Sequence, residues 1–540
     1  MSFDMSAHGL IPSPRRPEIP GGGPQNVADV LDTGVATMPD AEALVGRYAR
    51  YSYAELDREA NRAAHVLLQL GVRPGDRVAG SMANHTDLVV AFYGAMRVGA
   101  IWFGVNRALA PPEKAYMLRD GGAAVFVGDR EACAQIEGLP EALPELIHRI
   151  GAEPSDPGSQ WRELLARAPD ETRPEIEIDP FGPAAIAYTS GTTGFPKGAV
   201  HSQHNILMPG AVSAAAGLTE PNSRLGVSLP LTILNLMILG PAAAAQCRSC
   251  CVLMDRLDAV GLAEWIREER VANFASVPAV LRDLLTHPDV EQADLVSLTA
   301  PGVGGANCPD ELKDLFRMRF GREVRESYGL TEAPTVVSYT DPERPRVAGA
   351  VGTALAQVSL HILDAEGNEL SPGEVGEICV GASSEGRFEG VYTTMLGYWN
   401  RAEASREALR GGLLHTGDIG SLDADGNLFI RDRKSDLILR GGANVYPAEV
   451  ERVLHEDPRV GACAVVGVPD PRLGERVMGA VQLARGAPAT DTIEDELREH
   501  CRANLARYKV PDRILLVEAF PLTPMGKIRK RDIKGWFEAP

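Results

Sequence analysis

Cysteine is scarce in this sequence, with 8 residues among 540. So few and so scattered thiols exclude a disulfide framework and indicate a reducing compartment. Cys247, Cys250 and Cys251 form one cluster, but no second pair or histidine set follows at the spacing of a zinc site. We therefore interpret them as buried or incidental thiols and expect a cytoplasmic protein.

An excess of basic residues is also missing, because 54 Lys+Arg stand against 73 Asp+Glu and give a formal net charge of −19. This balance excludes the broad basic face that a nucleic-acid-binding protein needs. The longest stretch without charge, 225–247, is interrupted by Pro230 and Pro241. What remains is shorter than the ~20 residues of a membrane-spanning helix. We predict a buried strand and helix there, and no transmembrane span.

Short apolar runs alternate with helical patterns through most of the chain. Ser52 and Glu55 form a capping box ahead of apolar residues at helical spacing, and Gly71 closes that helix. A strand at 78–84, a helix and a strand at 101–106 follow. This order favours an α/β fold with parallel sheets. The first 23 residues contain proline and glycine and no apolar core, which predicts a loose leader and not a signal peptide.

The pattern changes after about residue 357, where strands joined by turns predict a β-rich subdomain. A compact α+β unit of about 105 residues follows, with Pro447 at the start of its first helix. We predict a large N-terminal domain of mixed and parallel sheets with packed helices, 1–434, and a small mobile α+β C-terminal domain, 435–540.

The segment 185–200 is the most informative in the chain. An apolar strand leads into a loop of hydroxyl residues and glycines, followed by Lys197. Glycines let several backbone N–H groups point at one anion, and lysine adds a point charge for phosphate. No Walker pattern GxxxxGK[ST] occurs in the chain, so this is a phosphate loop of another lineage. Its residues are Thr189, Ser190, Gly191, Thr192, Thr193, Gly194 and Lys197.

Four further motifs follow in order. They are Tyr328-Gly329-Leu-Thr331-Glu332, His415-Thr-Gly-Asp418, Asp432-Arg433 through Gly441-Gly442 to Pro447, and Pro521-Leu-Thr-Pro-Met-Gly-Lys527. With the phosphate loop, these motifs resemble those of the adenylate-forming superfamily, which includes acyl-CoA synthetases and aryl-CoA ligases. The resemblance covers nearly the whole chain. Any one motif could arise by chance, but five in the right order indicate membership.

The resemblance implies a two-step reaction. A carboxylate joins the α-phosphate of ATP with loss of pyrophosphate, and the acyl group then passes to a thiol. The first step brings two anions together, so charge must be neutralised where it develops. The resemblance assigns the phosphates to the loop at 190–198 and Mg²⁺ to Glu332. It implies that Thr331 hydrogen-bonds the α-phosphate region and that Tyr328 stacks on adenine. Asp418 and Arg433 would bind the ribose. Lys527 would be the catalytic lysine that acts in the adenylation transition state.

For the second step, the resemblance implies that the C-terminal domain turns about a hinge near Ser435 and admits the pantetheine arm of CoA. Gly441 and Gly442 would line that tunnel, because glycine permits close backbone approach. Arg507 and Lys509 are candidates for the phosphates of CoA or part of a solvated face. For the basic run around Lys527, the alternatives are a solvated tail or a weak attachment to anionic lipid.

Acid specificity is expected from small residues at 276–279 and at Gly302 to Ala306, where Gly305 and Ala306 form the adenine edge by resemblance. Small residues indicate room for a bulky aliphatic or aromatic acid; tight packing is the alternative. In the stretch 230–236, Thr232 and Ile233 replace the aromatic and histidine gate of many relatives. We expect a more open or more apolar tunnel mouth there.

The leading hypothesis is a freestanding ligase that uses ATP, Mg²⁺ and CoA to activate a hydrophobic fatty or aryl carboxylic acid. An adenylating enzyme that loads a carrier protein is the alternative. A non-catalytic acyl-binding protein would be expected to lose Lys197, Glu332, Asp418, Arg433 or Lys527, and all five are present. A homodimer remains open.

Overall fold

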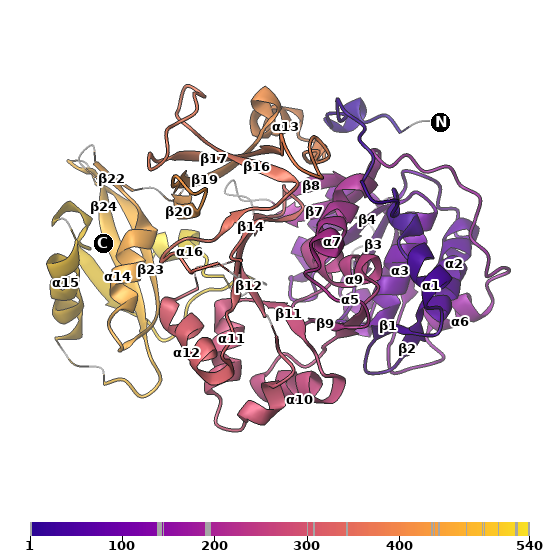
Figure 1. Ribbon diagram of the computed structural model, residues 1–540, viewed down its shortest axis with the longest axis horizontal. Coiled ribbons are helices and arrows are strands. Elements are labelled where there is room, and N and C mark those ends of the chain that lie inside the picture. Colours follow the sequence, from indigo (N-terminus) through magenta and orange to yellow (C-terminus); the bar gives the residue numbers. More distant parts are fainter. Residues whose placement is uncertain are drawn as a thin grey trace. The chain divides into compact units, whose positions relative to one another are not determined.

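The computed structural model describes most of the chain and divides it into two compact units (Figure 1). One unit comprises Met1–Leu360 and Cys379–Thr416, and the other His361–Ile378 and Gly417–Pro540. The described residues are 3–137, 143, 145–189, 196–299, 301–305, 308–341, 344–433, 436, 438–440, 443–470, 472–488, 490, 492–505, 507–523 and 527–537.

A seven-stranded sheet forms one layer of the first unit. In spatial order its strands are β18 (Gly397–Tyr398), β8 (Lys197–Ser202), β7 (Pro183–Thr189), β4 (Ile101–Gly104), β3 (Arg77–Ser81), β5 (Ala123–Gly128) and β6 (His148–Gly151). The five strands from β7 to β6 are parallel, whereas β8 and β18 are antiparallel to their neighbours. The predicted strand–helix–strand order is confirmed in β3, α3 (Thr86–Arg97) and β4.

A nine-stranded sheet forms a second layer. Its order is β15 (Thr353–Ala354), β14 (Thr335–Tyr339), β13 (Arg325–Leu330), β12 (Gly302–Gly304), β11 (Asn273–Ser276), β9 (Arg224–Val227), β10 (Cys250–Leu253), β1 (Glu42–Val45) and β2 (Arg50–Ser52). The six strands from β13 to β1 are parallel, and the flanking strands are antiparallel. This mixed architecture confirms the α/β prediction.

Helices cover both sheets of the first unit. They are α1 (Asp32–Thr37), α2 (Tyr53–Gln69), α4 (Pro111–Gly121), α5 (Arg130–Glu137), α6 (Gln160–Ala166), α7 (Gln203–Ala216), α10 (Ala259–Glu269), α11 (Pro278–Thr286), α12 (Asp310–Phe320) and α13 (Ala402–Ala408), besides α3. Figure 1 shows α10, α11 and α12 along the same side of β11 and β12. One apolar core, which contains Ile266, Phe274 and Phe316, joins them to the sheet.

Two local predictions are confirmed in this unit. Ser52 accepts a hydrogen bond from the backbone N–H of Glu55, and the Glu55 carboxylate accepts one from that of Ser52, which forms the capping box of α2. The uncharged stretch 225–247 contains all of β9 except Arg224, and then α8 (Leu234–Met237), a π-helical turn (Ile238–Ala242) and α9 (Ala243–Cys247). The π turn contains Pro241, which has no N–H for a helical hydrogen bond.

Within the described part of the chain, no helix is both long and apolar enough to cross a bilayer. All eight cysteines are described, and each one is free. Cys247, Cys250 and Cys251 are buried, and burial raises the pKa of each thiol. They are therefore packed neutral side chains, as predicted.

The prediction of a loose leader is wrong for residues 3–11. The His8 ring stacks on Trp399 with centroids 4.0 Å apart, and Phe3 stacks on His8. The backbone N–H of Asn400 donates to the His8 carbonyl at 2.8 Å, and that of Ile11 donates to Leu396 at 2.7 Å. The docking partners lie almost 400 residues away in sequence, so the local composition of the leader carries no sign of them.

The second unit contains the predicted α+β tail. Its sheet consists of β22 (Ala443–Val445), β21 (Ile438–Arg440), β24 (Gly474–Leu483) and β23 (Val460–Asp470), with β25 (Arg513–Leu516) paired to β24. Its helices are α14 (Pro447–His455), α15 (Ile493–Asn504) and α16 (Lys530–Lys534). The predicted helix start at Pro447 and the second helix are both confirmed.

The predicted β-rich segment is a four-stranded sheet in the order β16 (Val358–Leu363), β17 (Gly376–Ala382), β19 (Leu414–Leu422) and β20 (Leu428–Arg433). The division between the units falls within β16, β17 and β19. The turn between β19 and β20 contains Gly426 at φ +78°, as expected of a hairpin.

Candidate active site

Strands β7 and β8 hold the two ends of the predicted phosphate loop. Thr189, the last residue of β7, pairs with Lys197, the first residue of β8, and its hydroxyl lies 3.4 Å from the Lys197 carbonyl. The apolar strand that the sequence predicts before the loop is therefore present. Ser190, Gly191, Thr192, Thr193 and Gly194 lie outside the described residues.

One face of β8 carries the polar side chains of Lys197 and His201. Lys197, Ala199 and His201 alternate along the strand and therefore point to the same side. Tyr398 of β18 pairs directly with Ala199, so its ring lies on that side as well. The Lys197 ammonium lies 5.3 Å from the centroid of the Tyr398 ring, within the range of a cation–π contact.

His201 links this face to the motif that follows β13. Its Nε2 atom lies 2.8 Å from the carbonyl oxygen of Thr331, and the side chain is completely buried. Burial lowers the pKa of His201 to about 4, so the ring is neutral at pH 7. Because a carbonyl only accepts, Nε2 carries the proton and donates it to Thr331. Thr331 is thus held by its backbone against β8.

The turn that carries Thr331 and Glu332 is tightly built. A Cβ atom on Gly329 would lie 1.9 Å from the carbonyl oxygen of Thr335, so only glycine fits there. Thr335 itself has φ +86°, a strained conformation for a β-branched residue. Strain of this kind persists where surrounding structure enforces it, and it is concentrated at functional sites.

Glu332 is half-buried, and its carboxylate is anchored by Tyr398. The Tyr398 hydroxyl donates a hydrogen bond to Oε1 of Glu332 at 2.8 Å. Among the described residues, no ion pair joins Lys197 directly to Glu332. The structure therefore brings the cation and the carboxylate to the same tyrosine side chain.

Other predicted residues of the first unit lie on neighbouring strands. Tyr328 is buried on β13 beside Gly329, where the register with β14 shifts. Gly305 follows β12 directly and has φ +77°, which favours glycine. Ala306 lies outside the described residues. β12 and β13 are adjacent and parallel, so their carboxyl ends place Gly305 and the Tyr328 motif at the same edge of the sheet.

The second unit carries the remaining predicted residues. Asp418 on β19 is buried, and its backbone lies in register with that of Arg433 on β20. The backbone N–H of Lys527 donates to the hydroxyl of Thr523 at 3.1 Å, and its side chain is exposed. Gly441, Gly442 and the hinge candidate Ser435 lie outside the described residues. Of the CoA candidates, Lys509 forms an ion pair of 2.6 Å with Glu449.

Sequence reasoning missed Tyr398 and His201. The signal for His201 was its position four residues after Lys197, because that spacing places both on one face of a strand. Tyr398 lies 66 residues beyond Glu332, in a strand of two residues, and nothing local indicates its partner.

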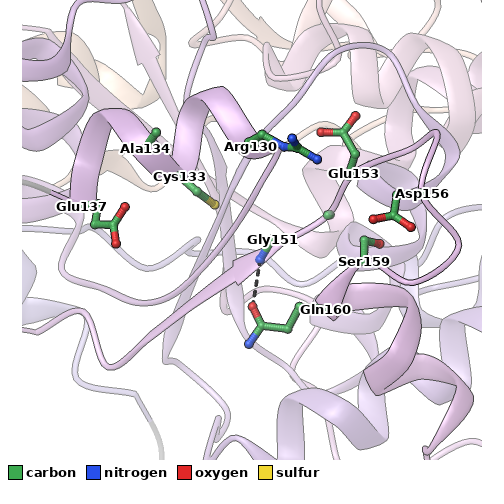
Figure 2. A pocket seen from close by; sticks show the side chains of 10 residues that line it. Arg130, Cys133, Ala134, Glu137, Gly151, Glu153, Asp156, Ser159 and Gln160 are labelled. Atoms are coloured by element: carbon green, nitrogen blue, oxygen red, sulfur yellow. Dashed lines mark hydrogen bonds between the residues drawn. The ribbon is translucent and has the colours of Figure 1, made fainter.

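A separate pocket of about 340 Å³ lies at the carboxyl ends of β5 and β6 (Figure 2). Its lining includes Arg130, Cys133, Glu153 and Gln160, and the backbone N–H of Gly151 donates to Gln160 at 3.1 Å. Burial raises the pKa of Cys133 to about 11, so its thiol is neutral and a poor nucleophile. None of the predicted site residues lines this pocket.

The chain matches two domain families. The family described as AMP-binding enzyme matches residues 31–399, and its C-terminal domain matches residues 449–527. The chain is 33% identical to the long-chain-fatty-acid–CoA ligase FadD13 of Mycobacterium tuberculosis over 530 residues, 95% of this chain and 99% of the relative. It is 32% identical to the fatty acid–[acyl-carrier-protein] ligase ScoC of Streptomyces coeruleorubidus, over 92% of this chain and 94% of the relative.

A solved structure agrees with these relatives. The anthranilate CoA ligase AuaEII in complex with anthranoyl-AMP superposes with a TM-score of 0.86 at 26% identity, over 95% of this chain and 97% of that one.

Proposed function

This chain belongs to the AMP-binding enzyme family, and on that premise we propose that it is an ATP-dependent acid–thiol ligase. It activates a hydrophobic carboxylic acid as acyl-AMP, releases pyrophosphate and transfers the acyl group to CoA. The family membership that the five motifs predict is therefore confirmed.

One observation carries the proposal. The first unit brings Lys197, at the end of the predicted phosphate loop, and Glu332 to the same Tyr398 side chain. A cation beside a phosphate loop neutralises the charge of a polyphosphate, and a carboxylate nearby suits a hard divalent cation. Adenylation needs both functions together, because a carboxylate must approach a phosphate.

The donor set at Glu332 fits Mg²⁺. Its carboxylate offers hard oxygen ligands, and the one hydrogen bond that it accepts from the described residues occupies Oε1 only. Bound there, Mg²⁺ would neutralise charge on the phosphate oxygens of ATP. Thr331, fixed through its carbonyl by His201, would present its side chain to the α-phosphate region.

The second unit supplies the remaining roles in this proposal. Asp418 and Arg433 would bind the ribose, and Lys527 would stabilise the charge that develops during adenylation. We assign the boundary between the two functional domains to residues 434 and 435, with Gly441 and Gly442 lining the path of the pantetheine arm. A cytoplasmic location and the possible homodimer stay predictions.

CoA is the proposed acceptor, and FadD13 and AuaEII are both ligases that use CoA. A carrier protein is the second candidate, because ScoC is a ligase that acylates a carrier protein and covers nearly the same length. The acid is proposed to be fatty or aryl, as in the names of these relatives.

A product assay tests the proposal. The protein is incubated with ATP, Mg²⁺ and a panel of fatty and aryl acids, with CoA, with a phosphopantetheinylated carrier protein, or with neither. We expect AMP and pyrophosphate, with turnover that depends on CoA. AMP formation accelerated only by the carrier protein would favour the second candidate. ADP as the product, or no product with any acid, would refute the ligase assignment.

A further inference from the structure

We propose that Tyr398 is a positioning residue that orients the Glu332 carboxylate for a divalent cation and holds the Lys197 ammonium beside it. This inference rests on the proposed function for the identity of the cation site. It concerns a residue outside the five motifs and assigns it a role in assembling the site.

The backbone of Tyr398 is fixed more firmly than a two-residue strand would be alone. Its N–H donates to the Ser405 hydroxyl at 2.8 Å, and that hydroxyl, completely buried, donates to the Arg401 carbonyl at 2.8 Å. The neighbouring Gly397 has φ +117°, and a Cβ atom there would lie 2.6 Å from the same hydroxyl oxygen. The start of α13 therefore locks the backbone of β18.

The next residue is fixed as well. The backbone N–H of Trp399 donates to the Gly198 carbonyl at 2.7 Å, and its indole N–H donates to the Asp120 carbonyl at 2.9 Å. Gly198 directly follows Lys197. The segment with Tyr398 and the end of the phosphate loop thus form one hydrogen-bonded piece of sheet.

Two of the contacts that the Tyr398 side chain makes from this fixed backbone differ in their chemistry. Its hydroxyl donates to Oε1 of Glu332 at 2.8 Å, which leaves Oε2 and the other lone pairs for a cation. Its ring face attracts the Lys197 ammonium at 5.3 Å. A phenol is neutral, so it orients both charges without cancelling either of them. Groups that hydrogen-bond a ligating carboxylate from outside orient that ligand and tune its affinity for the metal.

The test uses the full-length protein with Mn²⁺ as the probe. Mn²⁺ held by the protein, without acid or CoA, is measured by equilibrium dialysis at a fixed ATP concentration, because ATP itself complexes Mn²⁺ equally on both sides of the membrane. We expect Tyr398→Phe, which keeps the ring and loses the hydroxyl, to weaken Mn²⁺ binding about tenfold. In a Glu332→Gln background, we expect the same substitution to change it by less than about twofold, because the carboxylate on which the hydroxyl acts is gone.

Two further variants separate positioning from folding. Tyr53→Phe removes another buried hydroxyl, on α2, which donates to the Ser249 carbonyl at 2.9 Å. This variant should leave Mn²⁺ binding unchanged. Glu332→Asp keeps the charge but withdraws the carboxylate from Tyr398 by one methylene, and serves as the probe if Tyr398→Phe unfolds. Its Mn²⁺ binding should weaken, and no weakening in a folded Glu332→Asp variant would overturn the inference.

Equal losses from Tyr398→Phe in both backgrounds, no loss in either, or no Mn²⁺ binding by the wild type would overturn the inference. The outcome is distinct from that of the ligase proposal, because metal and nucleotide binding need neither acid nor CoA. Coupled Mn²⁺ binding in a protein that forms no AMP would uphold the role of Tyr398 and refute the ligase.

Discussion

The ammonium of Lys313 lies 2.5 Å from Oε2 of Glu326, and both side chains are buried. Glu326 stands two residues before Tyr328 on β13, and its other carboxylate oxygen accepts the backbone N–H of Cys308 at 3.3 Å. Burial raises the pKa of Glu326, whereas the nearby carboxylates raise the pKa of Lys313 despite its burial. The pair therefore anchors the strand that leads into the site.

We expect Lys313→Met to destabilise the protein by about 3–5 kcal/mol, because it leaves a buried carboxylate without its cation. The double variant Lys313→Met/Glu326→Gln should recover most of this loss, since the amide oxygen still accepts from Cys308 and the carboxylate that remains, Asp310, is partly exposed to solvent. Urea unfolding at pH 7 measures both. The exposed Arg167–Glu163 pair gives the control, and Arg167→Met should leave the midpoint unchanged. A double variant no more stable than the single one would contradict this account.

Much of the fold follows from local patterns, because capping boxes, apolar periodicity and the proline before α14 act within a few residues. The ends of the phosphate loop were predictable for the same reason. Tyr398 and the docked leader were not, because each meets partners that are remote in sequence. Hydrogen bonding across a sheet and stacking between distant rings leave no periodic signal in either segment.

A second prediction concerns Lys527. Its backbone is held from both sides, because Leu522 forms an antiparallel bridge with Ile528 and the N–H of Thr523 donates to the Lys527 carbonyl at 2.7 Å. We expect Lys527→Ala to slow acyl-AMP formation by about 100-fold or more, the usual loss when a group that stabilises developing charge is removed. Transfer to CoA from a supplied acyl-AMP should change little, because that step needs no second adenylation.

Pyrophosphate release and acyl-CoA formation from synthetic acyl-AMP are measured separately for this variant. Lys534→Ala is the matched control, since Lys534 belongs to the same basic run on α16. Equal losses in both half-reactions would contradict a role confined to adenylation. The same loss in the control would assign the effect to the charge of the run.

A third prediction concerns acid stability. Burial and the charge of Arg162 lower the pKa of His85 to about 4, although Asp255 acts in the opposite direction. An unfolded histidine has a pKa of about 6.5. Between these values the unfolded chain binds a proton that the folded chain does not, so stability from neutral His85 is complete above pH 6.5 and is lost as pH falls.

His85→Asn isolates this contribution. Asparagine still accepts the backbone N–H of Asp87 that His85 caps at 3.1 Å, but it does not titrate. Burial raises the pKa of Asp87 to about 6, so protonation of Asp87 below that pH stabilises the folded protein. We expect this stabilisation to be the same in both proteins and to cancel from their difference. From pH 7.5 to 5, urea unfolding should show the wild type losing about 2 kcal/mol more than the variant. Parallel losses would contradict the assignment.

The last prediction concerns the docked leader and uses two glycines with similar backbones. Gly9 has φ +67° and Gly22 has φ +70°. A Cβ atom on Gly9 would lie 2.7 Å from the backbone nitrogen of Ala402, whereas one on Gly22 would meet no atom within 4 Å. Both alanine variants carry the left-handed strain of about 1–2 kcal/mol, but only Gly9→Ala adds a clash with α13.

We therefore expect Gly9→Ala to release residues 3–11 from Trp399, and Gly22→Ala to leave them docked. Limited proteolysis should cut the first variant within the leader faster than the second or the wild type, because an undocked segment is accessible to proteases. Loss of the His8 stack should also shift the tryptophan emission, since the Trp399 ring would gain water on that face. Cleavage of both variants at the same rate would contradict this account, because the clash at Gly9 would then add nothing to the strain that both variants share.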